Sequence, residues 1–339
     1  MRVINIRTLL NLKCCGFLEI ANSRTIEEKM WVRKKKVGIA LSGGAARGLA
    51  HIGVLEVLEE LGVEPVAISG TSMGSIIGSF YCSGVSLGEM EKYVGSMDWR
   101  SFLLFSDLAL SHTGIINGRR IERVLERFLE DKTFSDCSMD FCCVAVNVIT
   151  RQKEVLSRGR LLDAVRASIS IPGFFSPLYL DGKLLIDGGL IEPLPTEAIK
   201  MFDVNFIIGS SITFERDSEK YRYLQMDDHH PAGEGQVYDH HNTGTGNPDR
   251  FKKLHDLFKG RKRDEEHKSV SVQSILDTSL NIIHREMASK YENLADIVIK
   301  PEVGDFGFFD LTNGSEIIKR GREAAEAKAG EIRRKLRLR

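Results

Sequence analysis

The stretch Pro65-Val-Ala-Ile-Ser-Gly70-Thr71-Ser72-Met73-Gly74-Ser-Ile-Ile-Gly78 decides the fold of this chain. A short apolar run, typical of a buried strand, meets Gly-Thr-Ser-Met-Gly and passes directly into an apolar helix. A Gly-x-Ser-x-Gly pentapeptide between a strand and a helix is the context of a nucleophile elbow. Gly70 and Gly74 suit a sharp turn at which a side chain would collide with a neighbouring element. The alternative is a Gly-rich turn in which Ser72 only caps the helix.

A second Gly-rich turn precedes this one by one strand and one helix. Val37–Leu41 is short and apolar, as a buried parallel strand is, and Ser42-Gly43-Gly44-Ala45-Ala46-Arg47-Gly48 follows it. Apolar residues then recur at helical spacing from about Gly48 to Leu61. Together with the strand over 65–69 these elements predict a right-handed βαβ unit.

The first turn suits an oxyanion better than a nucleotide. It lacks the G-x-G-x-x-G fingerprint, because Ala45 stands at the second glycine position, and it lacks the Gly-Lys-Ser/Thr of a P-loop. What remains is a cradle of backbone N–H groups at a helix start, one strand away from a candidate nucleophile. Arg47 either ties this loop down or favours an anionic substrate head group.

Two Asp-Gly pairs later in the chain have different roles. Asp181-Gly182 lies between two apolar runs and predicts a hairpin turn. Asp187-Gly188-Gly189 ends the second run, so its carboxylate emerges at a strand terminus. Further strands are predicted over 141–149, 204–210 and 295–300, and helices over 76–83, 87–94, 118–130, 161–168, 193–201, 270–290 and 315–339.

Composition bounds the class of protein. The 339 residues are 42% hydrophobic, and Lys+Arg and Asp+Glu both number 47, so no charge excess points to nucleic acid. No apolar run approaches the length of a membrane span, and Cys82, Cys142 and Cys143 read as buried thiols of a reducing compartment. We therefore expect a soluble cytoplasmic protein, with a peripheral contact to a membrane surface left open. The oligomeric state stays undetermined.

A polar segment interrupts the chain between about 213 and 268. It holds six of the nine histidines, in clusters such as Asp227-Asp-His-His230 and Asp239-His-His241. A metal site is one interpretation, but no two histidines have the spacing of a helical site, and a mobile insertion is the preferred one. We predict an N-terminal extension over 1–36, a catalytic core over 37–212, this insertion over 213–268, and helices and a strand over 269–339 that complete the domain, with no metal and no cofactor.

A serine nucleophile needs a base. His51, His112 and His284 are the candidate histidines, but none closes a strand as the histidine of an α/β-hydrolase does. A carboxylate can act instead when burial raises its pKa. Asp187, at a strand end beside two glycines, is the best-placed one.

The two Gly-rich turns and Asp187-Gly-Gly189, in this order and spacing, closely resemble the patatin-like phospholipase family. The resemblance runs from about Val37 to Pro195. The later helix and Gly304-Asp-Phe-Gly-Phe-Phe309 look like bacterial and archaeal members related to neuropathy target esterase. The resemblance implies an α/β fold of three layers, α/β/α, with a mostly parallel central sheet.

The resemblance also implies roles for single residues. By position Ser72 is the nucleophile and Asp187 its base, a dyad without histidine, and the amides of Gly43, Gly44 and Ala45 form the oxyanion hole. Arg47, Gly48, Gly70, Gly74, Gly188 and Gly189 support these motifs. Many members of the family have glycine at the position of Ala45. This difference puts the geometry of the oxyanion hole in doubt only if the position needs a positive φ.

The predicted function is a serine acyl hydrolase of lipid esters, of phospholipase or lysophospholipase type, acting on a lipid or fatty-acyl ester. One alternative is a non-catalytic lipid-binding module of the same fold. Another is a serine esterase or acyltransferase that uses a histidine. The sequence does not indicate which ester is cut.

Overall fold

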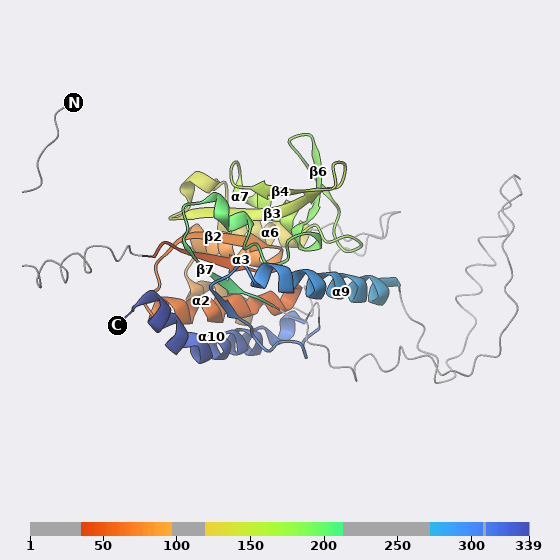
Figure 1. Ribbon diagram of the computed structural model, residues 1–339. Helices are drawn as coiled ribbons and strands as arrows, with labels where there is room; N and C mark the ends of the chain where they lie inside the picture. The colour runs from red at the N-terminus through yellow and green to blue at the C-terminus, as the bar shows by residue number, and fades with distance from the viewer. Residues whose placement is uncertain (1–34, 97–118, 213–271, 308–309, 339) are drawn as a thin grey trace, which may run out of the picture.

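The computed structural model describes residues 35–96, 119–212, 272–307 and 310–338, and within them eight strands form one sheet (Figure 1). Its centre is parallel: β3, β2, β1, β7 and β8 lie side by side in this order. Their bounds are β1 Val37–Leu41, β2 Pro65–Thr71, β3 Asp140–Asn147, β7 Phe206–Ser210 and β8 Ile297–Ile299.

The antiparallel part of the sheet gathers around β3. Strand β4, Gln152–Leu156, pairs with β3, and the hairpin of β5, Leu178–Leu180, and β6, Lys183–Asp187, joins β3 through β6. Ala145 of β3 pairs with residues of both β4 and β6, and Val144 with residues of both β4 and β2. Strands β2 and β6 therefore share one edge of β3, and the last residue of β6 lies next to the last residue of β2 along that edge.

Helices cover the two faces of the sheet unequally. The α-helices are α2 Ala50–Glu60, α3 Met73–Cys82, α4 Leu87–Ser96, α6 Arg119–Leu129, α7 Leu161–Ser168, α9 Val272–Glu292 and α10 Gly314–Leu336. Shorter 3₁₀ turns are η2 Ala45–Leu49, η3 Phe134–Asp136, η4 Gly188–Leu190, η5 Ala198–Met201 and η7 Leu311–Asn313. Figure 1 shows α2 and α10 packed together. Tyr291 of α9 packs in a separate cluster with Ala40 of β1, so α9 covers the other face of the sheet.

Alternation along β1 shows how the two layers are built. Ile39 and Leu41 point into the large core formed with α2, α3 and α10, whereas Ala40 points into a smaller cluster with η5 and α9. A side chain at Gly38 would meet Ile199 of η5. Small residues on the second face thus let η5 and α9 approach the sheet closely.

The α/β class with a mostly parallel central sheet is confirmed. Most predicted elements form within a few residues of their predicted bounds, and the Asp181-Gly182 hairpin turn joins β5 to β6. Among the described residues no helix is long and apolar enough to cross a membrane. Residues 1–34 and 213–271, which include both His clusters, lie outside the described residues, as does His112.

One predicted helix is wrong, and one strand was not predicted. The helix expected from Pro193 shrinks to the turn η5, because the buried carboxylate of Glu192 accepts the N–H groups of Glu197 and Ala198 in place of helix carbonyls. Strand β4 was missed because it is polar. Its Lys153 pairs at 2.7 Å with Glu192, which lies in the segment between η4 and η5, so a charge that would otherwise disfavour a strand is neutralised there.

Candidate active site

Ser72 lies at the junction of β2 and α3, in a strained backbone conformation. Its φ of 52° and ψ of −121° fall where a non-glycine residue rarely lies, at a typical cost of about 1–3 kcal/mol. The Ser72 side chain makes no capping hydrogen bond to the helix, so the alternative in which it serves only as an N-cap loses its support. Strain of this kind is usually retained where it presents a reactive group.

The glycines on either side of Ser72 are required by close packing. A Cβ at Gly70 would collide with the Gly74 carbonyl, and a Cβ at Gly74 with the Leu41 carbonyl of β1. Gly48 and Gly188 are similarly confined, by Met73 and by the Val144 carbonyl. The elbow is thus held directly against the main chain of β1 and α3.

Strand register brings Asp187 to the elbow. Thr71, the last residue of β2, pairs with Val144 of β3, and Asp187, the last residue of β6, pairs with Ala145 on the same edge. Successive residues of a strand are about 3.3 Å apart, so the ends of β2 and β6 meet there. Ser72 and Asp187 converge although 115 positions separate them in the sequence.

Burial controls the protonation of Asp187, which is 4% exposed. Desolvation raises the pKa of its carboxyl from 3.8 to about 6, and the Ser72 hydroxyl and the Gly189 N–H partly oppose the rise. Oδ1 accepts the Gly189 N–H at 2.7 Å. Oδ2 is buried, and within the described residues it accepts no hydrogen bond of ordinary geometry. The Ser72 hydroxyl therefore lies near the carboxylate without closing a full bond, as catalytic pairs often do before substrate binds.

The Gly-rich loop after β1 passes beside Ser72. A Cβ at Gly43 would lie 3.4 Å from Cβ of Ser72. The Gly43 N–H, however, donates to the Pro193 carbonyl at 2.9 Å and cannot also donate to a substrate oxygen. The oxyanion-hole role of Gly43 therefore stays a prediction, which this hydrogen bond disfavours. The amides of Gly44 and Ala45, at the start of η2, keep that role as a proposal.

Ala45 occupies the position whose backbone decides the geometry of the hole. Its φ is 49°, in the left-handed region that favours glycine. Alanine therefore accepts strain there and still presents its N–H at the start of η2.

Arg47 and His51 hold the loop in place. Arg47 is 5% exposed, and its Nε donates to the Phe306 carbonyl at 2.7 Å. The buried His51 ring contacts the Ser42 carbonyl through Nε2 and the Ser210 hydroxyl through Nδ1, both at 2.8 Å. Burial lowers the pKa of His51 to about 4. Both ring nitrogens are used in these contacts, so His51 is not the base for Ser72.

His284 reaches the site from α9. The Cβ position of Gly43, already close to Ser72, lies 3.6 Å from Cε1 of His284, and the Cβ position of Gly189 lies 2.9 Å from the same atom. Burial and the nearby charge of Arg47 lower the His284 pKa to about 4, so the ring is neutral at pH 7. The sequence shows His284 only as a mid-helix residue, and no local signal indicates where α9 packs.

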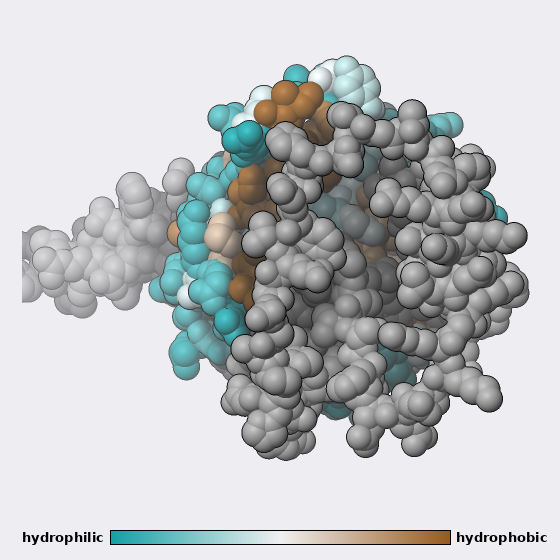
Figure 2. All heavy atoms as spheres, turned by 90° about the vertical axis from the view of Figure 1, so that its right-hand side faces the viewer, coloured by the Kyte–Doolittle hydropathy of each residue, from teal (hydrophilic) through white to brown (hydrophobic). Residues whose placement is uncertain are grey.

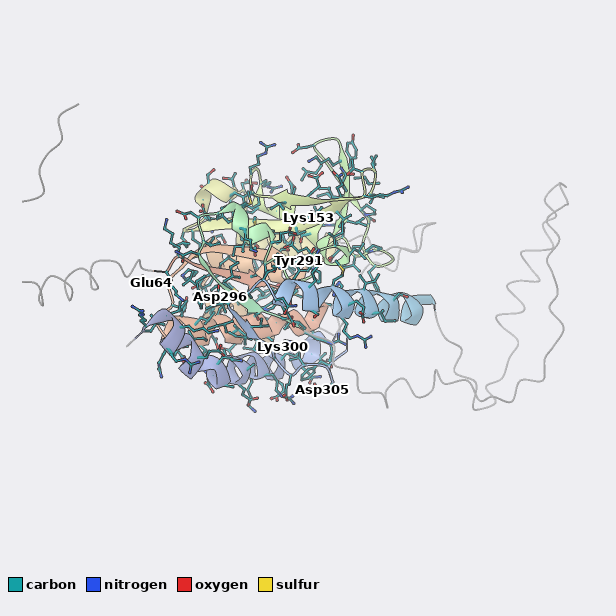
Figure 3. The ribbon with its side chains drawn as sticks, in the orientation of Figure 1. Glu64, Lys153, Tyr291, Asp296, Lys300 and Asp305 are labelled. Carbon is teal, nitrogen blue, oxygen red and sulfur yellow. The ribbon has the colours of Figure 1, made fainter. Side chains whose placement is uncertain are left out.

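The C-terminal end of α9 fixes this placement. Tyr291 is buried, and its carbonyl accepts the Thr196 hydroxyl at 2.7 Å. Asp296, just beyond the helix, accepts the Ile207 N–H of β7 at 2.8 Å. Figure 3 shows Tyr291 and Asp296 where the helix meets the sheet.

Ser168 of α7 also supports the elbow, and the sequence analysis missed it. Its hydroxyl accepts the Ser72 N–H at 3.0 Å and donates to the Val144 carbonyl at 2.7 Å, which ties Ser72 to β3. The Thr71 hydroxyl donates a hydrogen bond to the Glu192 carbonyl at 2.9 Å. Ser168 ends a predicted helix, and nothing in its sequence surroundings distinguishes it from a surface serine.

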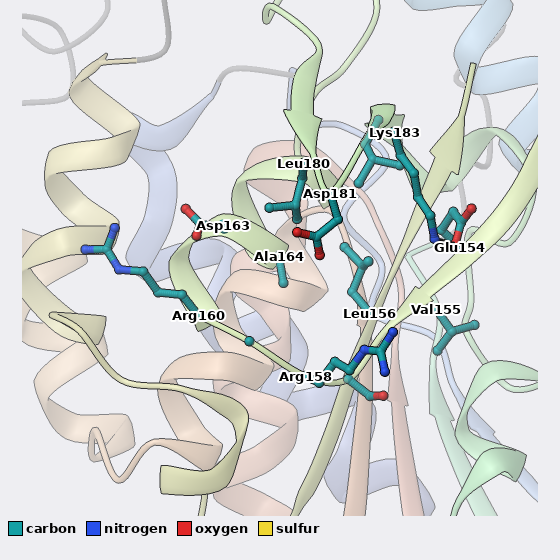
Figure 4. Close-up of a pocket in the computed structure, with 13 residues that line it drawn as sticks. Glu154, Val155, Leu156, Arg158, Arg160, Asp163, Ala164, Leu180, Asp181 and Lys183 are labelled. Atoms are coloured by element: carbon teal, nitrogen blue, oxygen red, sulfur yellow. Dashed lines mark hydrogen bonds and ion pairs between the residues drawn. The ribbon is translucent and has the colours of Figure 1, made fainter. Parts of the chain in front are cut away.

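Within the described residues, neither a metal cluster nor the cavity beside β4 adds to this site. No group of three or more His, Cys, Asp and Glu side chains that could hold a metal occurs in the part of the chain that the structure describes. A cavity of about 460 Å³ lies between β4, the start of α7 and the β5–β6 hairpin, and Figure 4 shows it lined by Arg158, Arg160, Asp163, Asp181 and Lys183. Neither Ser72 nor Asp187 lines it.

Comparisons with known proteins show which family the chain resembles. A model of the patatin-like phospholipase family matches residues 39–200. A protein of Mycobacterium tuberculosis named "Uncharacterized NTE family protein" is 34% identical over 177 residues, which cover 52% of this chain and 49% of the relative. "Lysophospholipase NTE1" of Candida glabrata is 31% identical over 193 residues, 55% of this chain and 11% of that protein. The chain therefore spans about half or less of the length of these relatives.

A solved structure shares the fold. VipD from Legionella pneumophila superposes with a TM-score of 0.50 over 88% of this chain and 67% of that chain. At 14% sequence identity this likeness shows a common fold only. The family match contains the elbow, the Gly-rich loop and Asp187 in one continuous range. Residues 39–200 of this chain therefore form a patatin-like phospholipase domain, related in sequence to the NTE family proteins.

Proposed function

We propose that the chain is a serine acyl hydrolase of lipid esters, of phospholipase or lysophospholipase type. The observation that carries the proposal is a strained, buried Ser72 beside a carboxyl, Asp187, whose pKa is raised to about 6. A carboxylate of this pKa is a competent base near neutral pH. The names of the related lysophospholipases support a lipid ester as substrate.

The reaction proceeds in two acyl transfers. Ser72 Oγ attacks the ester carbonyl carbon while its proton passes to Asp187, and the Gly44 and Ala45 amides stabilise the oxyanion. The C–O bond to the alcohol breaks, and the alcohol leaves with the proton that Asp187 carries. Water then attacks the acyl-serine carbonyl carbon and gives a proton to Asp187. Asp187 returns this proton to Ser72 Oγ as the acyl C–O bond breaks, which releases the fatty acid and regenerates the Ser72 hydroxyl and the Asp187 carboxylate.

Hydrolysis of a panel of phospholipids, lysophospholipids and glycerides by the purified chain tests the proposal. Ser72→Ala and Asp187→Asn should each lower kcat by about 10³-fold or more, because each removes an atom that takes part in bond making. Ser96→Ala and Asp181→Asn, at exposed positions, are the matched controls and should keep wild-type rates.

The same panel separates the alternatives. A chain that binds lipid but hydrolyses no member of the panel would be the non-catalytic module. An Asp187→Asn variant that retains full activity would exclude the Ser–Asp dyad and favour a serine esterase with another base.

Peripheral contact with a lipid surface forms part of the proposal. Large apolar side chains are exposed at Ile149 and Tyr179, beside the sheet, and at Ile282 and Ile283 on α9. Figure 2 faces the side on which α9 and the β5–β6 hairpin project and shows apolar surface gathered there. Such side chains favour an apolar boundary over water.

Vesicle binding tests this surface. The double variant Ile149→Asp, Ile282→Asp should bind phosphatidylcholine vesicles less well and hydrolyse vesicle lipid more slowly, while a monomeric soluble ester is cut at the wild-type rate. Equal co-sedimentation of the variant and the wild type would place the membrane contact elsewhere.

A further inference from the structure

The His284 ring lies against both halves of the catalytic centre. A Cβ built at Gly43, beside Ser72, would lie 3.6 Å from its Cε1, and a Cβ built at Gly189, two residues after Asp187, would meet its Nε2 and Cε1. The Cβ built on the backbone of Gly189 would lie 2.9 Å from Cε1 of His284 and 3.0 Å from Oδ1 of Asp187, and it would lie closer to Nε2 of His284 than to either of these atoms. Nε2 therefore borders the Asp187 side of the dyad.

The Asp187 side is where an alcohol leaves and where water enters. In the proposed reaction Asp187 delivers a proton to the leaving oxygen and later takes one from water, so both oxygens must stand next to its carboxylate in turn. A donor at this place would stabilise the negative charge that develops on the leaving oxygen as the C–O bond breaks. A neutral imidazole can donate in this way without giving up its proton.

We propose that His284 is a further catalytic residue of this reaction, whose Nε2–H donates a hydrogen bond to the oxygen of the leaving alcohol and then to the attacking water. The inference rests on the proposed function. The proton balance stays with Asp187, which protonates the alcohol and deprotonates the water, while the imidazole remains neutral throughout. Its placement on α9, anchored by Tyr291, makes this contact a fixed part of the site.

The experiment compares two esters of one acyl chain, an alkyl ester and a p-nitrophenyl ester, as monomeric substrates. Nitrophenolate is a stable anion and leaves without help, whereas an alkoxide needs a donor. His284→Leu keeps bulk and removes the donor, His284→Gln keeps an N–H near the position of Nε2, and Arg285→Ala on the exposed side of the same helix turn is the control.

For His284→Leu, kcat/KM should fall about 10- to 100-fold with the alkyl ester and no more than about threefold with the p-nitrophenyl ester. Because the same variant also binds water less well, deacylation slows, and a pre-steady-state burst of nitrophenolate should appear that the wild type lacks. His284→Gln should recover part of the alkyl-ester rate.

If kcat/KM falls equally for both esters and no burst appears, His284 has only a structural role. If kcat/KM rises for both esters, the imidazole ring hinders the reaction. Either result overturns the inference. Fluorophosphonate labelling of Ser72 keeps these outcomes apart from failure of the proposed function. Fluoride leaves without a donor, so labelling should persist in His284→Leu and be absent in Ser72→Ala.

A double-mutant cycle checks the contact itself. Gly189→Ala places a Cβ against the His284 ring and should lower the melting temperature, and adding His284→Ala should restore much of that loss. Strict additivity of the two changes would show that the ring does not lie against Gly189.

Discussion

At the scale of single residues, the acid in the β5–β6 hairpin turn and the acid at the end of β6 differ because of burial. Asp181 is exposed in the turn, whereas Asp187 is enclosed by β3, the elbow and Gly189, and its pKa rises to about 6. A carboxyl group with this pKa is ionised at neutral pH and can accept a proton. Because the pKa is close to the working pH, the protonated form can also give the proton up again in a later step.

The rate should therefore depend on pH through Asp187. We expect kcat/KM to rise with pH along a single limb of apparent pKa about 6, since only the ionised carboxylate accepts the Ser72 proton. Initial rates on a soluble ester between pH 4.5 and 8, in buffers of about constant ionic strength, measure this limb. A rate independent of pH across this range would contradict the assignment of the base.

The same group should make the protein less stable at neutral pH. The folded pKa of about 6 lies above the unfolded value of 3.8, so the folded state holds the proton more tightly, and stability falls as pH rises through this window. Asp187→Asn removes a penalty of up to about 3 kcal/mol, so it should raise the free energy of unfolding at pH 7.5 and do so less at pH 4.5. Urea titrations at the two pH values give the difference.

The sequence indicates the residues that carry local signals and misses those placed by tertiary packing. Ser72 and Asp187 stand out because each ends an apolar strand beside glycines. His284 and Ser168 reach the site from helix faces that carry no such mark. The commitment of the Gly43 N–H to Pro193 depends on a loop 150 residues away, so no local pattern could reveal it.

At the scale of elements, α2 and α10 pack through two glycines. A Cβ at Gly53 would meet the Ile318 carbonyl, and one at Gly321 would meet the Ala50 carbonyl, so the two helix backbones touch. This contact supports the start of α2, which follows directly from the loop of Gly44 and Ala45.

Substitutions on α10 should reflect that packing. Gly321→Ala forces the helices apart and should cost about 2–4 kcal/mol of unfolding free energy. Gly330→Ala, on the same helix with open space around it, should be neutral or stabilising by about 0.5–1 kcal/mol. Thermal melts of the two variants compare them directly, and an equal effect would contradict the helix contact.

Elements with a clear periodicity are predictable, and those stabilised by distant charges are not. Strand β1 and helix α7 have the bounds that their apolar patterns predict. Strand β4 depends on the pairing of Lys153 with Glu192, and η5 on the Glu192 carboxylate, so both depend on one buried acid that the sequence presents as an ordinary polar residue.

At the scale of the whole molecule, one sheet assembles the site from distant parts of the chain. Strand β2 brings Ser72, β6 brings Asp187, β1 leads into the Gly-rich loop, and α9, which lies between β7 and β8 in the sequence, brings His284. Because the central strands are parallel and β2 and β6 share one edge of β3, Ser72, Asp187, the Gly-rich loop and His284 lie together. The central claim is that Ser72 is the nucleophile that this assembly activates.

Mass spectrometry of the chain after reaction with a fluorophosphonate tests that claim most directly. The account predicts one phosphonylated peptide, carrying the adduct on Ser72, formed slowly in Asp187→Asn and absent in Ser72→Ala. An unmodified Ser72 in the folded wild-type protein, or an adduct on another serine with Ser72 untouched, would contradict it.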